Sequence, residues 1–151
     1  MKTFFLVLII CLLCFTSNLN GQDNGALRVA RTSFSSAERN YNNGRYKDAL
    51  QEFKIVVNSI PVETDSRRHL EMRMNALNYI IEISFYKYVN IETGCEYVHL
   101  FLSNMDVIRN SDVLRPSQRL DLLRQEQEYH ADFVSRCESY QDSGEDIDGF
   151  R

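Results

Sequence analysis

Apolar residues recur every three or four positions along most of the chain, which is the spacing of one face of an α-helix. In the clearest stretch, Leu50, Phe53 and Val57 follow one another at this spacing. The same pattern predicts five helices, over residues 27–42, 45–60, 65–89, 94–109 and 116–140. No stretch alternates apolar and polar residues with the period of two that a half-buried strand shows, so the sequence predicts an all-α fold without a sheet.

The predicted helices are separated by residues that favour turns and helix ends. Gly44 follows two asparagines and is expected to take a left-handed backbone conformation after the first helix. Pro61 is expected to end the second helix. Thr93 and Glu96 have the spacing of a capping box and predict the start of the fourth helix. Pro116 is suited to the first turn of the fifth.

The long third helix and the last helix differ in their apolar content. Residues 65–89 carry two apolar stripes, so this helix is expected to lie centrally between neighbours. The last helix has few apolar positions and a charged run at 124–128. We therefore expect it to be an outer helix with one face in solvent.

The first 21 residues have the pattern of a secretory signal peptide. Lys2 precedes an apolar run from Phe4 to Phe15, and polar residues follow. The run is short for a membrane span, so an uncleaved anchor is the less favoured alternative, as is lipidation at Cys11 or Cys14. The pattern predicts an exported protein, periplasmic or secreted, without stable membrane insertion after cleavage.

Removal of residues 1–21 leaves one helical domain at 22–141 and an acidic tail at 142–151 that is expected to be disordered. The whole chain has a formal charge of −4, and its first 21 residues contribute one lysine and no acid, so residues 22–151 carry −5. A mildly acidic protein lacks the positive field that attracts nucleic acid or anionic membranes, so neither is expected as a partner.

Two cysteines, Cys95 and Cys137, remain after cleavage. In an oxidising compartment they could form a disulfide that stabilises the fold by about 4 kcal/mol, or they could remain two buried thiols. With His99 and His130 they could also form a tetrahedral zinc site if their helices face each other, although the spacing matches no known zinc module. No metal and no other cofactor is predicted.

Residues 30–61 resemble a tetratricopeptide repeat, a pair of antiparallel helices of about 34 residues. The match is carried by the stretch from Tyr41 to Phe53, which contains Gly44, Tyr46, Ala49 and Leu50, and by the closing Pro61. Ala37 and Ala49 are small where the paired helices would cross, and Tyr46 and Phe53 would fill the wedge toward the next pair. The following helix runs through the place where the next repeat would turn, so a generic helical bundle is the alternative.

The resemblance implies a concave groove that binds a peptide or a partner protein. If it holds, the first helix faces this groove with Arg31, Phe34, Glu38, Tyr41 and Asn42. Aromatic side chains on a helical stripe are often core, so Phe34 and Tyr41 could instead pack inside.

No catalytic constellation is visible in the sequence. The chain lacks a nucleophile elbow, a glycine-rich phosphate loop and a His-Glu-x-x-His pair, and Glu126 and Glu128 belong to a solvated helix face. We therefore expect a non-catalytic, exported interaction module. The alternative is a small exported inhibitor or immunity-type protein that blocks its partner with an acidic surface; an enzyme is the third and least favoured function.

Overall fold

The computed structural model describes the chain from residue 25 to residue 145, with side chains up to residue 140. This part is all-α, as predicted, and contains no strand. Helical residues 25–42 form the first helix. The elements that follow are α2 (Tyr46–Ser59), α3 (Arg67–Glu82), the π-helical η1 (Ile83–Lys87), α4 (Ile91–Arg109), α5 (Pro116–Tyr129), the π-helical η2 (His130–Val134) and α6 (Ser135–Glu145).

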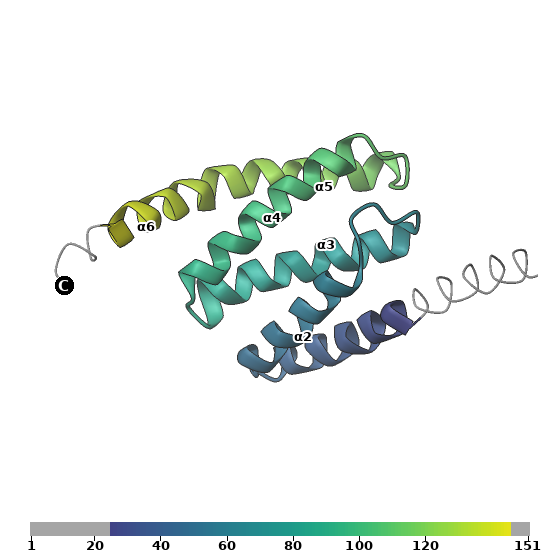
Figure 1. The fold of residues 1–151 in the computed structure, drawn as a ribbon, viewed down its shortest axis with the longest axis horizontal. Helices are drawn as coiled ribbons and strands as arrows, with labels where there is room; N and C mark the ends of the chain where they lie inside the picture. The colour runs from purple at the N-terminus through teal and green to yellow at the C-terminus, as the bar shows by residue number, and fades with distance from the viewer. Residues whose placement is uncertain (1–24, 146–151) are drawn as a thin grey trace, which may run out of the picture.

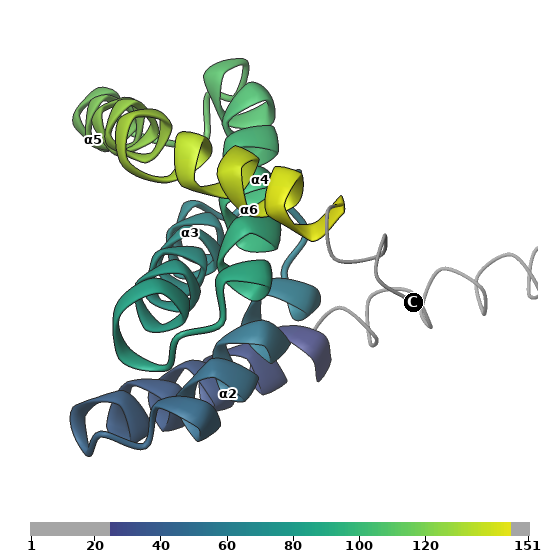
Figure 2. The ribbon, with the colours of Figure 1, turned by 90° about the vertical axis from the view of Figure 1, so that its left-hand side faces the viewer.

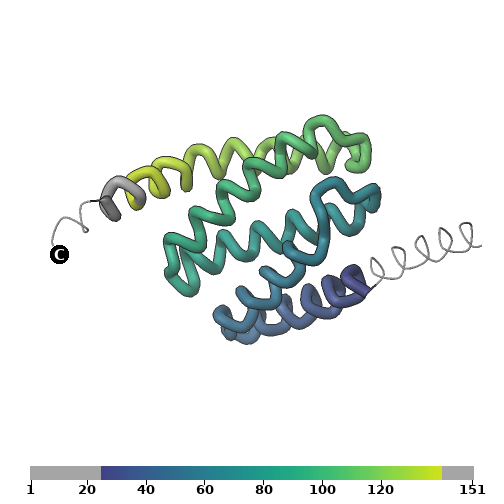
Figure 3. Tube along the Cα trace, viewed as in Figure 1, coloured from purple at the N-terminus to yellow at the C-terminus, as the bar shows by residue number. Residues whose placement is uncertain are grey.

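Counted with their π-helical continuations, these elements make five helices, the number that the sequence predicts. Each helix returns antiparallel to the one before it, and the array grows in one direction from the first helix to α6 (Figures 1 and 3). Neighbours in sequence are therefore neighbours in space, and the fold is a helical array.

The first hairpin depends on one glycine and two alanines. Gly44 has φ +72°, the left-handed conformation that glycine adopts without strain, and its N–H donates to the carbonyl of Tyr41 at 3.0 Å. Ala37 and Ala49 are completely buried. These observations confirm the predicted turn at Gly44, and small side chains let the two helices approach closely.

Helix α3 lies in the middle of the array, as its two apolar stripes predict. Phe53 of α2 is fully buried and stacks on Tyr79 of α3, with ring centroids 4.6 Å apart. Arg73 of α3 donates from Nη1 to the carbonyls of Val57 and Ile60. Because the last carbonyls of a helix lack intrahelical partners, this buried guanidinium also closes the end of α2.

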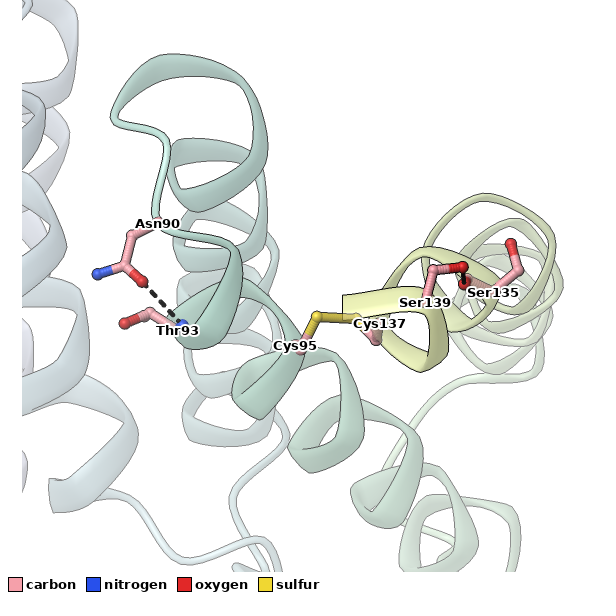
Figure 4. Close-up of a disulfide and its surroundings, with 6 residues drawn as sticks. All are labelled: Asn90, Thr93, Cys95, Ser135, Cys137 and Ser139. Atoms are coloured by element: carbon pink, nitrogen blue, oxygen red, sulfur yellow. Dashed lines mark hydrogen bonds between the residues drawn. A yellow bond between two sulfur atoms is a disulfide. The ribbon is translucent and has the colours of Figure 1, made fainter. Parts of the chain in front are cut away.

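The turn between α3 and α4 differs from the prediction at both of its ends. The third helix ends at Lys87 rather than at residue 89. The fourth begins at Ile91, because Asn90, not Thr93, is its N-cap: the Asn90 side chain accepts the N–H of Thr93 at 3.1 Å (Figure 4). The predicted capping box of Thr93 and Glu96 is therefore wrong, since asparagine one turn earlier caps equally well.

The last helix is one continuous rod made of α5, η2 and α6. Its start is capped by Gln118, whose Oε1 accepts the N–H of Arg115 at 3.0 Å. Along its described side chains only Glu126, Phe133 and Cys137 are buried, which agrees with the predicted outer position. The helix continues to Glu145, so the first four residues of the predicted tail at 142–151 are helical rather than disordered.

A disulfide joins Cys95 of α4 to Cys137 of α6, with the two Cα atoms 5.5 Å apart (Figure 4). This pairing confirms the first of the two cysteine alternatives and excludes free buried thiols. It also excludes the zinc alternative with His99 and His130, because an oxidised cysteine offers no thiolate to a metal. Within residues 25–145, no three His, Cys, Asp or Glu side chains are grouped so that they could hold a metal ion.

The predicted signal peptide at residues 1–21 lies outside the described residues, and so do residues 146–151 of the predicted tail. Among the helices that are described, none is long and apolar enough to cross a membrane.

Candidate binding groove

Two of the predicted contact residues, Phe34 and Glu38, line an open hollow of about 370 Å³ between the first helix and α3. The opposite wall is formed by Asn75, Asn78, Tyr79 and Glu82. Phe34 is half-buried, with its ring edge-on to Phe53 and to Tyr79 at centroid distances of 5.6 and 6.5 Å. The ring thus packs against the core with one side and borders the hollow with the other.

The other three predicted residues are arranged differently. The hydroxyl of half-buried Tyr41 donates to Oε1 of Glu82 at 2.5 Å, so this side chain ties the first helix to α3. Arg31 Nη2 lies 3.0 Å from Nε2 of His69, nearer the start of α3. Asn42 is exposed beside the Gly44 turn and lines none of the described hollows.

The middle helix contributes a polar stripe that the sequence analysis did not predict. Glu71, Asn75, Asn78 and Glu82 follow one another at spacings of four, three and four residues, which places them on one face of α3. All four line hollows on this face. Two asparagines at helical spacing with two glutamates, inside a helix that carries two apolar stripes, are the signal that could have revealed it.

Helix α5 forms the third wall, and its backbone stays apart from that of α3. The Cα atoms of the two helices stay more than 8 Å apart, although Figure 2 shows them on the same side of the molecule, with α4 on the other. Long polar side chains bridge the gap. Asn78 donates to Gln125 at 3.2 Å and accepts from the Tyr129 hydroxyl at 2.8 Å, while Gln118 donates to Glu71.

These bridges leave two further hollows between α3 and α5, of about 230 and 250 Å³. The first shares Asn75 with the hollow beside the first helix, and the second shares Asn78 and Glu82 with it. Gln125 borders both of the hollows along α5. The three hollows are therefore adjoining, and we refer to them together as the groove.

The carboxylates of the groove act on its tyrosines. The hydrogen bond to Glu82, with burial second, raises the pKa of Tyr41 to about 12. Burial, and then the charges of Glu38 and Glu82, raise the pKa of Tyr79; burial, and then Glu128 and Glu82, raise that of Tyr129. These phenols stay protonated and uncharged at neutral pH, so the negative charge of the groove resides on the carboxylates.

The two glutamates considered for acid–base chemistry point to different places. Glu126 is buried and pairs with Arg109 of α4, whereas Glu128 is exposed and lines the groove. Two residues that are two positions apart on a helix do not share a face, so these carboxylates cannot act on one substrate atom together.

In class, then, the described chain is an all-α helical array with a polar groove between its first, third and fifth helices. No protein-family model, curated protein or solved structure matches it. The resemblance of residues 30–61 to a tetratricopeptide repeat therefore remains a prediction from the sequence.

Proposed function

We propose that this chain is an exported, non-catalytic interaction module that holds a peptide or a segment of a partner protein in the groove. The observation that carries the proposal is the separation of α3 and α5. Their Cα atoms stay more than 8 Å apart, and the polar face of α3 lies open between them and the first helix. Direct packing of the two helices would bury more apolar surface, so the open polar face supports a binding role.

The floor of the groove also suits a polypeptide. Asn75 borders the hollow of about 370 Å³ beside the first helix and the hollow of about 230 Å³ along α5. Its side chain is exposed and makes no hydrogen bond within the described part of the chain. An amide offers one acceptor and two donors, which matches the needs of a peptide backbone. Export is supported by the leader pattern of the first 21 residues, and the non-catalytic character by the absence of catalytic motifs in the sequence.

Site-specific photo-crosslinking in the native host tests this function. A benzoylphenylalanine replaces Asn75 in the groove or, as the control, Glu96, which is exposed on α4 and borders none of the described hollows. We expect the probe at position 75 to capture a defined exported protein that the probe at position 96 does not capture. Equal capture from both positions, or none from position 75, would remove the groove as a binding site.

The inhibitor alternative stays a prediction from the sequence. Its acidic tail lies mostly beyond Glu145, outside the described residues.

A further inference from the structure

The chemistry of the groove indicates what kind of segment it binds, and this inference rests on the proposed function. Five carboxylates line the three hollows, and no lysine, arginine or histidine lines them. They come from all three walls: Glu38, Glu71, Glu82, Asp121 and Glu128. Clefts lined by charge of one sign concentrate ligands of the opposite sign.

Cations of the chain itself compensate only part of this charge. At the rim, Arg67 lies 3.8 Å from Glu71, Lys87 lies 3.8 Å from Glu82, and Arg124 lies 3.1 Å from Asp121. Glu38 and Glu128 have neither an ion pair nor a hydrogen bond among the described side chains. Two negative charges therefore remain unpaired, one on each side of the polar stripe of α3.

Aromatic rings accompany both unpaired carboxylates. Phe34 and Tyr79 share a hollow with Glu38. Tyr86, which is 57% exposed, shares another with Glu128. The face of an aromatic ring attracts ammonium and guanidinium groups through its quadrupole, although the ring itself carries no charge. A carboxylate beside an open ring is a favourable environment for a Lys or Arg side chain.

We propose that the groove binds an extended polypeptide segment that carries two Lys or Arg side chains. One of them lies beside Glu38, near the rings of Phe34 and Tyr79, and the other lies beside Glu128 and Tyr86. The amide of Asn75 hydrogen-bonds to the backbone of the segment. Nucleic acid is excluded as the occupant because its phosphates would face the same carboxylates.

Fluorescence anisotropy with three short synthetic peptides tests the charge preference. The probes alternate glycine with lysine, glutamine or glutamate, and binding to the exported protein is measured at low and at near-physiological ionic strength. We expect the lysine peptide to bind most tightly, with an affinity that falls as salt rises, because exposed charges are screened. If the lysine peptide does not bind, or if the glutamine peptide binds equally well, the inference is wrong.

Matched variants separate the groove from the general acidity of the protein. Glu38→Gln with Glu128→Gln is expected to weaken binding of the lysine peptide about tenfold, which corresponds to two exposed charge contacts. Glu92→Gln with Glu96→Gln removes the same charge from exposed positions on α4 and is expected to change it less than about twofold. Equal effects of the two pairs would assign the binding to net charge and overturn the inference.

A third variant tests the rings without changing the charge. Tyr86→Leu is expected to weaken binding of the lysine peptide about threefold through the lost cation–π contact; an unchanged affinity would contradict the role of this ring. The crosslinked segment itself distinguishes the two proposals. A partner captured at position 75 through a segment without Lys or Arg would refute the inference and leave the proposed function intact, whereas no capture at all would refute the function.

Discussion

Helix α2 and the last helix, toward opposite ends of the array, are attached to their neighbours by different means. Helix α2 buries five apolar side chains in a continuous face, which packs against α3: Ala49, Leu50, Phe53, Val56 and Val57. Helix α5 buries only Glu126, and the rod that continues it adds Phe133 and Cys137. The last helix packs on α4, where the rings of Phe101 and Tyr129 have centroids 4.7 Å apart. The disulfide and the pair of Arg109 with Glu126 reinforce this attachment, and amide bridges join the helix to α3.

The difference between apolar packing at α2 and polar bridging at α5 explains the position of the groove. Apolar packing favours the closest approach of two helices, since every contact removes surface from water. Between α3 and α5, polar side chains span a gap without closing it. The first helix borders one of the three hollows, and the other two lie along α5, where polar side chains bridge to α3.

The largest effect is expected from truncating the apolar end of the array. Phe53→Ala removes a fully buried ring that stacks on Tyr79, and it should lower the free energy of unfolding by about 4 kcal/mol. Urea denaturation followed by circular dichroism measures the change. Ile55→Ala on the same helix, where the side chain is 40% exposed, should cost less than about 1 kcal/mol. Equal losses would contradict the role assigned to the buried face of α2.

Removal of the disulfide should give a smaller and more local effect. In the variant Cys95→Ala with Cys137→Ala, the free energy of unfolding should fall by about 3 kcal/mol, because the unfolded chain loses a constraint on a long loop. This is less than the ideal loop-entropy value of about 4 kcal/mol, since an unfolded chain retains some structure. Hydrogen exchange should accelerate in α5 and α6 and stay slow in α2 and α3. Uniform acceleration along the whole array would show that the two ends do not differ in the way described here.

The contact between the first turn of α4 and η1 lies between these two regions and can be tested at Gly94. A Cβ added to Gly94 would lie 2.6 Å from Cε2 of Phe85, so this ring would have to move. Gly94→Ala should therefore destabilise the protein by about 1–2 kcal/mol, although glycine to alanine inside a helix normally stabilises it by up to about 1 kcal/mol.

Two further variants control for helix propensity at Gly94. Gly25→Ala adds a methyl group that meets nothing within 4 Å, and it should be neutral or slightly stabilising. Combining Gly94→Ala with Phe85→Leu should recover part of the loss if the clash with the ring is its cause. Thermal unfolding of the three variants decides the sign; a stabilising Gly94→Ala would contradict the contact with Phe85.

The smallest effect concerns the polar link between the first helix and α3. The pKa of Tyr41 is raised from 10.0 to about 12, so the folded state holds this proton more tightly than the unfolded chain does. The stability from this bond is complete below pH 10 and is lost as pH rises from 10 to about 12. Tyr41→Phe should make the fall in stability over this window shallower, measured by urea unfolding at each pH. Tyr88→Phe, at an exposed ring, serves as the control and should leave the fall unchanged.

Two of the five predicted contact residues line the groove, and the polar face at its centre was not predicted. The stripe of residues on the first helix that includes Phe34 and Glu38 was expected to face a groove, and both side chains line one. The four polar residues of α3 do not stand out in the sequence, because apolar periodicity reports the buried stripes of a helix and not its polar face. Their importance depends on α5 remaining at a distance, and no local feature of the sequence reports the distance between two helices.

By itself the sequence determined the local features of the protein: five helices, the left-handed turn at Gly44 and the sparse apolar face of the last helix. These follow from the spacing and conformational preferences of neighbouring residues. Only the tertiary structure decided between Asn90 and Thr93 as the helix cap, and whether Cys95 and Cys137 could meet. It also opened the groove, because the gap between α3 and α5 depends on side chains that are far apart in the chain.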